Sequence, residues 1–156
     1  MPSPHIPAHW RHFMLNAIEA DQPYKPIREG LFQIDPPRLL GSQCPACRTK
    51  VYPAKGFCPQ CDGDGAERPH VVPLSPEGVV FAYTVIHQAP AGRKTPYVLA
   101  YVDLDDEVRV LAQIHAPHTD IRIGQRVALA LCAAGTEDGK PVIGYAFVLV
   151  DQSRGA

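Results

Sequence analysis

Four of the five cysteines fall within eighteen residues, as two Cys-x-x-Cys pairs in CPACRTKVYPAKGFCPQC, residues 44–61. Thiolate sulfurs suit zinc, and four of them close a tetrahedron that leaves no position for water or substrate. The two-residue gap lets each pair wrap one face of the ion. A proline follows the first cysteine of each pair, where its fixed φ favours a tight turn. The spacing predicts one structural Zn²⁺, held by Cys44, Cys47, Cys58 and Cys61.

Other chemistry for these cysteines is weaker or left open. An iron centre of rubredoxin type fits the same four ligands. A catalytic zinc is disfavoured, because such sites keep an open position and a mixed ligand set. A redox disulfide is disfavoured, because two pairs at matched spacing exceed what that chemistry needs. The pattern therefore indicates a metal and does not say what the metal serves.

The remaining candidates for chemistry favour a protein with no catalytic residues of its own. Cys132 lies in the apolar segment RVALALCA, where a lone cysteine behaves as a small buried hydrophobe. The histidines of HAPH have no carboxylate-rich ligand set beside them, and we expect His115 and His118 at the surface. Three aspartates surround a turn, and we expect a solvated hairpin tip there: Asp103, Asp105 and Asp106.

The charge balance argues against a nucleic-acid partner. The 156 residues include 15 Lys plus Arg and 16 Asp plus Glu. Nucleic-acid modules need a basic groove for phosphate contacts, and the chain has no basic cluster beyond Arg93-Lys94. Three tyrosines are candidates to stack on bases, but alternating tyrosines on a strand are expected to pack instead: Tyr83, Tyr97 and Tyr101.

Membrane and export signals are missing from the pattern. No run of 18 apolar residues exists, which excludes a transmembrane helix. The start MPSPHIPAHWRHF has no basic segment followed by an apolar core, so we expect no signal peptide. We therefore expect a cytoplasmic protein, in which clustered thiols stay reduced and available to a metal.

The second half of the chain predicts a small β-barrel. Five segments are rich in Val, Ile, Tyr and Phe, and Asp and Gly turn signals separate several of them. Five is the strand count of the OB-fold. Hairpins are expected at LDDEV and at GTEDGKP, and a crossover or short helix is expected at APHTDIRIG. The predicted strands are 79–87, 96–104, 108–114, 126–133 and 142–150.

The first half of the chain predicts a helical extension followed by a metal-binding lobe. We expect an N-terminal extension over 1–38, a zinc ribbon over 39–68, the barrel over 69–151 and a tail over 152–156. Between the cysteine pairs we expect two short strands and a turn. Apolar residues recur with helical period in the extension, and this stripe either packs on its own domain or docks on a partner: Trp10, Phe13, Met14, Ala17 and Ile18.

Several stretches together resemble the zinc-ribbon plus OB-fold proteins that accompany acyl-CoA enzymes: LLGSQCPACRTKVYPAKGFCPQC, GVVFAYTVIHQAP, PYVLAYVDLDDEVRVLAQI and IRIGQRVALAL. The resemblance covers roughly residues 39–150. It implies a mainly β fold, with an N-terminal helical segment, a rubredoxin-like zinc ribbon and a five-stranded OB-fold barrel. Arg48 and Glu107 stand where the family usually has glycine.

The resemblance also implies a non-catalytic accessory subunit of an acyl-CoA-processing complex, of the thiolase type, that helps to bind or shield CoA and to bridge subunits. The alternatives are a nucleic-acid-binding module or an accessory subunit of an acyl-CoA hydratase or aldolase. The expected partners are that enzyme subunit and a CoA thioester. For the CoA phosphates we expect His87, Arg93 and Lys94 at the barrel rim, with Lys50 and Lys55 as alternative cations. Solvated loop residues are the competing interpretation.

Overall fold

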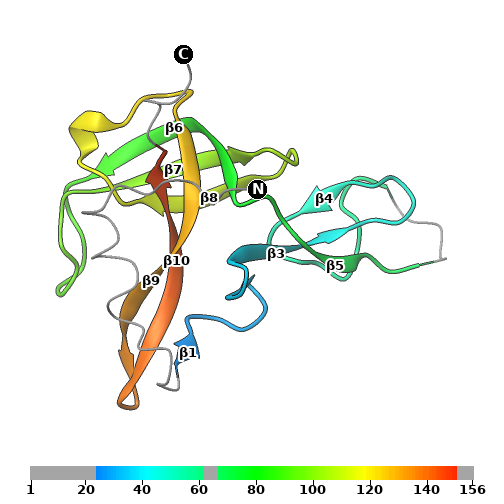
Figure 1. Cartoon of the computed structure of the whole chain (residues 1–156), viewed down its shortest axis with the longest axis horizontal. Helices are drawn as coiled ribbons and strands as arrows, with labels where there is room; N and C mark the ends of the chain where they lie inside the picture. The colour runs from blue at the N-terminus through cyan, green and yellow to red at the C-terminus, as the bar shows by residue number, and fades with distance from the viewer. Residues whose placement is uncertain (1–23, 62–66, 151–156) are drawn as a thin grey trace.

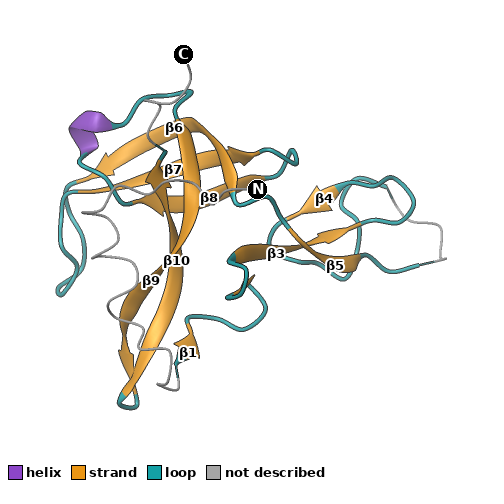
Figure 2. Cartoon of the chain, viewed as in Figure 1, coloured by secondary structure: helices purple, strands orange, loops and turns teal. Residues whose placement is uncertain are grey.

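The computed structural model describes residues 24–61 and 67–150, and within these ranges the regular secondary structure is all strand except for one short 3-10 helix. Figure 2 shows a barrel and a smaller strand-rich lobe that projects to one side of it. The mainly β prediction is therefore confirmed. The predicted N-terminal helix lies outside the described residues.

Five strands close into the barrel (Figure 1): β6 (Glu77–Ile86), β7 (Tyr97–Leu104), β8 (Arg109–Ile114), β9 (Arg126–Glu137) and β10 (Lys140–Leu149). They pair in the order β6–β7–β8–β10–β9, and β9 pairs with β6 to complete the ring. All contacts are antiparallel except β8 with β10, where Ile114 faces Phe147 in parallel. This is the five-stranded OB-fold that we predicted. The 3-10 helix His118–Asp120 lies between β8 and β9.

Both predicted hairpins are present. β7 and β8 join through residues 105–108, and β9 and β10 join through Asp138 and Gly139. These two residues have φ of 52° and 73°, as a two-residue turn that matches strand twist requires. The β9–β10 hairpin runs on past the barrel, and the short strand β1 (Lys25–Pro26) pairs with it in parallel at Val142 and Ile143.

Alternation along the strands builds the barrel interior. On β7, Val98, Ala100 and Val102 are at most 1% exposed, and Phe147 of β10 is fully buried among the same cluster. Burying a side chain of this size contributes about 1.5–3 kcal/mol. The alternation of buried and exposed residues in YVLAYVDL thus places one side of β7 in the barrel interior and the other side outside.

The metal lobe is built on β3 (Arg38–Gln43), which pairs with β2 (Phe32–Gln33), β4 (Lys50–Val51) and β5 (His70–Pro73). Between the cysteine pairs only β4 is a strand, so the prediction of two strands there is wrong. The longest partner of β3 is β5, which lies beyond residue 68, where we expected the ribbon to end.

The ribbon and the barrel share one hydrophobic core. Leu39 of β3 and Leu74, just after β5, are 0% and 1% exposed and belong to the same buried cluster as the barrel valines. The Leu74 amide also donates to the Leu39 carbonyl at 2.8 Å. Tyr52 next to β4 packs edge-on against Tyr145 of β10, with ring centroids 6.0 Å apart. These contacts fix the metal lobe against the barrel wall.

Candidate metal centre and barrel surface

The four predicted cysteines converge at one end of the ribbon. Their sulfur atoms all lie within 4.8 Å of one another. Cys44 Sγ is 3.7 Å from Cys61 Sγ, and Cys47 Sγ is 3.5 Å from Cys58 Sγ. A tetrahedron with Zn–S bonds of about 2.3 Å has S···S edges of about 3.8 Å. The arrangement therefore fits a single metal ion with four sulfur ligands. This ion would cross-link the two Cys-x-x-Cys turns, which we call knuckles.

Local hydrogen bonds prepare the sulfurs of Cys44 and Cys47 to act as thiolates. The backbone amide of Cys47 lowers the pKa of Cys44, and the Ala46 amide adds to this effect. A hydrogen bond with the Thr49 hydroxyl, assisted by the Thr49 amide, lowers the pKa of Cys47 to about 6. The Gln60 amide lies 3.4 Å from Cys58 Sγ. Donors of this kind favour the charged form of a thiol, which is the form that binds a metal.

The first knuckle closes through a left-handed residue. The Cys44 amide donates to the Thr49 carbonyl at 3.0 Å, and the Arg48 amide donates to the Cys44 carbonyl at 2.9 Å. Arg48 has φ of 64°, and Glu107 in the β7–β8 turn has φ of 65°. Both positions where this sequence departs from the family's glycine thus keep the backbone conformation that glycine favours.

The three aspartates in and beside the β7–β8 turn form polar contacts, while Asp103 and Asp105 keep 35% and 48% of their side chains exposed. Asp103 accepts two hydrogen bonds from Arg109, at 2.6 and 2.9 Å. Asp105 accepts two from Arg126, also at 2.6 and 2.9 Å. Asp106 contacts Ser75 and Lys50. The predicted solvated tip therefore holds for Asp105, but the partners were missed: Arg109 lies opposite Asp103 in the hairpin, and the tertiary fold supplies Arg126 to Asp105.

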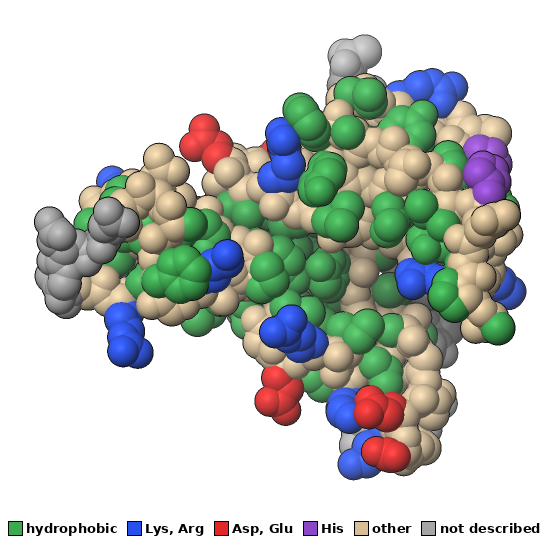
Figure 3. All heavy atoms as spheres, turned by 180° about the vertical axis from the view of Figure 1, so that it is seen from behind, with side chains coloured by type: hydrophobic (Ala, Val, Ile, Leu, Met, Phe, Trp, Pro, Cys, Tyr) green, Lys and Arg blue, Asp and Glu red, His purple; other side chains and the backbone are tan. Residues whose placement is uncertain are grey.

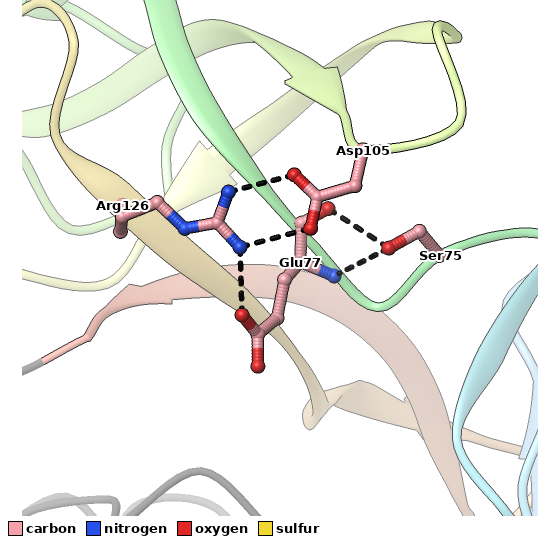
Figure 4. Close-up of polar contacts among 4 residues, drawn as sticks. All are labelled: Ser75, Glu77, Asp105 and Arg126. Carbon is pink, nitrogen blue, oxygen red and sulfur yellow. Dashed lines mark hydrogen bonds and ion pairs between the residues drawn. The ribbon is translucent and has the colours of Figure 1, made fainter.

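Figure 4 shows Arg126, at the start of β9, in contact with Glu77 at the start of β6 and with Asp105 in the β7–β8 turn. Besides Asp105, its guanidinium donates to Glu77 Oε2 at 2.7 Å. Ser75 closes the entry to β6, since its hydroxyl donates to the Glu77 carbonyl at 3.1 Å and accepts from the Glu77 amide at 3.3 Å. The cluster joins the first residues of β6 and β9 to the β7–β8 turn. These contacts give the cluster a structural role.

The predicted CoA residues lie in and beside the loop between β6 and β7. Arg93 stacks over the Tyr97 ring, 4.5 Å from its centroid, and donates to Gln113 Oε1 at 3.4 Å. His87 lies beside His118, with ring centroids 6.4 Å apart. Lys94 is exposed next to Arg93. The fold brings Arg93 onto the barrel wall.

The alternative cations are differently placed. Lys50 forms an ion pair with Asp106 at 3.3 Å. Lys55 lies over the Phe57 ring, 5.3 Å from its centroid. Lys50 is thus engaged between the two lobes.

Two other sequence candidates take structural places. Cys132 is buried, and burial raises the pKa of its thiol, as expected for a small hydrophobe rather than a nucleophile. His115 is half-buried rather than at the surface, and burial lowers its pKa. Its amide donates to the Phe147 carbonyl at the β8–β10 seam.

Sequence reasoning missed the exposure of the strand aromatics. Tyr101 is 47% exposed and Tyr83 is 37% exposed, so the expectation that these side chains pack is wrong for both. Register explains Tyr101: its neighbours Ala100 and Val102 occupy the barrel interior, so Tyr101 points outward. A strict alternation count on β7 would have found this.

With its four-cysteine lobe and its closed five-stranded barrel, the chain is a zinc-ribbon and OB-fold protein. Two family models match in that order: the rubredoxin-like zinc ribbon domain of ChsH2 over residues 34–67, and the C-terminal OB-fold domain of ChsH2 over residues 71–131.

Curated relatives match across both lobes. The benzoylsuccinyl-CoA thiolase subunit BbsA of Thauera aromatica is 34% identical over 112 residues, which cover 71% of this chain and 76% of that protein. A DUF35 domain-containing scaffold protein of Methanocaldococcus jannaschii is 31% identical over 114 residues, covering 70% and 79%.

A solved structure described as an Ltp2-ChsH2(DUF35) aldolase matches with a TM-score of 0.58 and 27% identity, covering 73% of this chain and 86% of that one. The chain belongs to this ChsH2-type family of zinc-ribbon and OB-fold proteins. The resemblance seen in the sequence is confirmed. No helix among the described residues is long and apolar enough to cross a membrane.

Proposed function

We propose that this chain is a non-catalytic accessory subunit of an acyl-CoA-processing enzyme of the thiolase type. The observation that carries the proposal is the similarity to a benzoylsuccinyl-CoA thiolase subunit across both ribbon and barrel. The metal centre supports a structural role, because four sulfur ligands leave no position on the ion for a substrate.

A second candidate keeps the accessory role and changes the partner. The similarity to a chain from an aldolase complex favours an acyl-CoA aldolase as the alternative catalytic subunit, and a hydratase belongs to the same group of partners. A nucleic-acid partner is disfavoured by the near-equal numbers of basic and acidic residues.

Within the complex, we assign the loop after β6 to the CoA thioester, with His87, Arg93 and Lys94 near its phosphates. Arg93 is held in place by Tyr97 and Gln113, so less conformational entropy is lost when it meets an anion. The complex belongs in the cytoplasm on this proposal, since a four-thiolate site persists where thiols stay reduced.

Purification of the native complex tests the proposal. We expect the untagged chain to co-purify with a thiolase-type subunit identified by mass spectrometry, and to show no turnover of acyl-CoA substrates alone. In the reconstituted complex, Arg93→Ala with Lys94→Ala should raise KM for the CoA substrate and leave assembly intact. An aldolase or hydratase in its place would select the alternative, and a monomer that binds no such enzyme would refute the proposal.

A further inference from the structure

The outer wall of β6, β7 and β8 carries large apolar side chains that face solvent. Phe81, Tyr101 and Leu111 are 49%, 47% and 52% exposed, whereas their strand neighbours Val80, Val102 and Val110 are at most 2% exposed. In Figure 3, hydrophobic side chains gather over the barrel on the side opposite to the view of Figure 1.

These side chains form one patch rather than scattered exceptions. Tyr101 pairs directly with Leu111 on β8 and with Ala82 on β6, so these three side chains point to the same side of the sheet. Phe81 is the extra residue of a β-bulge between Val80 and Ala82, and its ring lies on this side under Arg109, which pairs with Asp103. Leu99, two residues before Tyr101, shares that side. We call the set Phe81, Leu99, Tyr101 and Leu111 the outer aromatic face. Contiguous exposed apolar patches of this kind mark interaction surfaces, unlike single exposed side chains.

One end of the face is electrically neutral and already ordered. The Arg109 guanidinium lies over the Phe81 ring, 3.5 Å from its centroid, and donates two hydrogen bonds to the Asp103 carboxylate. Glu77, which alternation along β6 places on the same side, is paired with Arg126 at 2.7 Å. An arginine fixed against an aromatic ring loses little entropy on association, and both residue types are enriched in protein interfaces.

The other end is positively charged. Tyr97 and Gln113 lie on the same side as Leu99, and they hold Arg93 there at 4.5 Å and 3.4 Å. Arg93 and its neighbour Lys94 are exposed, and within residues 24–61 and 67–150 neither forms an ion pair. The matching surface is therefore apolar opposite Tyr101 and Leu111, and anionic opposite Arg93 and Lys94.

We infer that the outer aromatic face docks the catalytic subunit of the acyl-CoA enzyme, with the phosphates of its bound CoA thioester at the Arg93–Lys94 end. This rests on the proposed function and adds the surface through which it acts. A single nucleic-acid strand fits less well, because the centre of the face offers no unpaired cation for successive phosphates. A second copy of this chain also fits less well, because its face would place no phosphate opposite Arg93 and Lys94.

Binding of the purified thiolase-type subunit to full-length chain, in the presence of CoA, tests the inference by titration calorimetry. We expect Leu111→Asp to weaken Kd by about 30-fold or more, as for a central interface residue. Tyr101→Thr, which keeps a β-branched residue in the strand, should weaken it as well. Ile123→Asp is the matched control, since Ile123 is 69% exposed and lies outside the face, and it should leave Kd unchanged. Unchanged thermal unfolding and metal content establish that each variant is folded.

The outcomes separate the surface from the function. Tight binding by the wild type and equally tight binding by both face variants would overturn the docking face and leave the accessory role standing. Failure of the wild type to bind would remove the accessory role and the face together. A wild-type dimer that Leu111→Asp converts to monomer, or single-stranded RNA binding that Tyr101→Thr abolishes, would assign the face to those occupants and overturn the inference.

Discussion

Lys50 Nζ of the ribbon lies 3.3 Å from Asp106 Oδ2 of the barrel, and the same oxygen accepts the Ser75 amide hydrogen at 3.1 Å. Lys50 follows the first cysteine knuckle, Asp106 lies in the β7–β8 turn, and Ser75 lies on the segment between ribbon and barrel. One carboxylate therefore ties the metal lobe, its connection and the barrel together.

Removal of this ion pair should reduce stability modestly. Both side chains are partly buried, at 27% and 19% exposed, so solvent screens them less than a surface pair. We expect a coupling of about 1 kcal/mol in a double-mutant cycle of Lys50→Met and Asp106→Asn, measured by urea unfolding. The Lys25–Glu137 pair, which is more exposed, is the matched control and should show a coupling near zero. Equal couplings would contradict a special role for Asp106.

The metal should be present at one ion per chain. We expect Cys44→Ser and Cys61→Ser to lose it, because three thiolates cannot close the tetrahedron. Both variants should also unfold at lower temperature, since metal binding contributes to folding. Elemental analysis and thermal unfolding are the measurements. Cys132→Ser lies outside the site and should keep full occupancy, and visible absorption by the purified protein would identify iron instead of zinc.

Glycine should be tolerated or favoured at both left-handed positions. Arg48 and Glu107 have φ of 64° and 65°, a conformation that costs a residue with a Cβ about 1 kcal/mol. Arg48→Gly and Glu107→Gly should therefore exceed the corresponding alanine variants in unfolding free energy by up to about 1 kcal/mol. Gly139→Ala, at φ of 73°, should lower the unfolding free energy for the same reason. Alanine variants as stable as glycine variants would argue against strain at these sites.

Acid should weaken the Arg126 cluster. Hydrogen bonds from Arg126 lower the pKa of Asp105, so its folded value lies below the unfolded one. Its stabilising contribution is complete above the unfolded pKa and is lost as pH falls through the folded pKa. Asp105→Asn should lower Tm at neutral pH and have little effect in strong acid. In an Arg126→Met background this pH-dependent difference should largely disappear, and its persistence would assign it to another group.

The sequence predicted the parts of the fold that local patterns encode. Alternation in PYVLAYVDL and turn residues in GTEDGKP found the barrel strands and hairpins, and the cysteine spacing found the metal ligands. What it missed depends on segments far apart in the chain. β5 belongs to the ribbon through its pairing with β3, which lies some thirty residues earlier in the chain. Lys50 and Asp106 are separated by 56 positions. No local periodicity carries such pairings.

Because Leu39 and Leu74 share one core, the two modules that sequence comparison defines fold as one unit. Two family models divide the chain into modules near residue 70, but a cut at that point would strip β5 from β3 and open the buried leucines to water. A gene fragment for the barrel alone would lack Phe32 and Leu39, and one for the ribbon alone would lack Leu74 and the barrel valines that cover Leu39. Shuffling of such modules between proteins is therefore constrained to transfers of the pair.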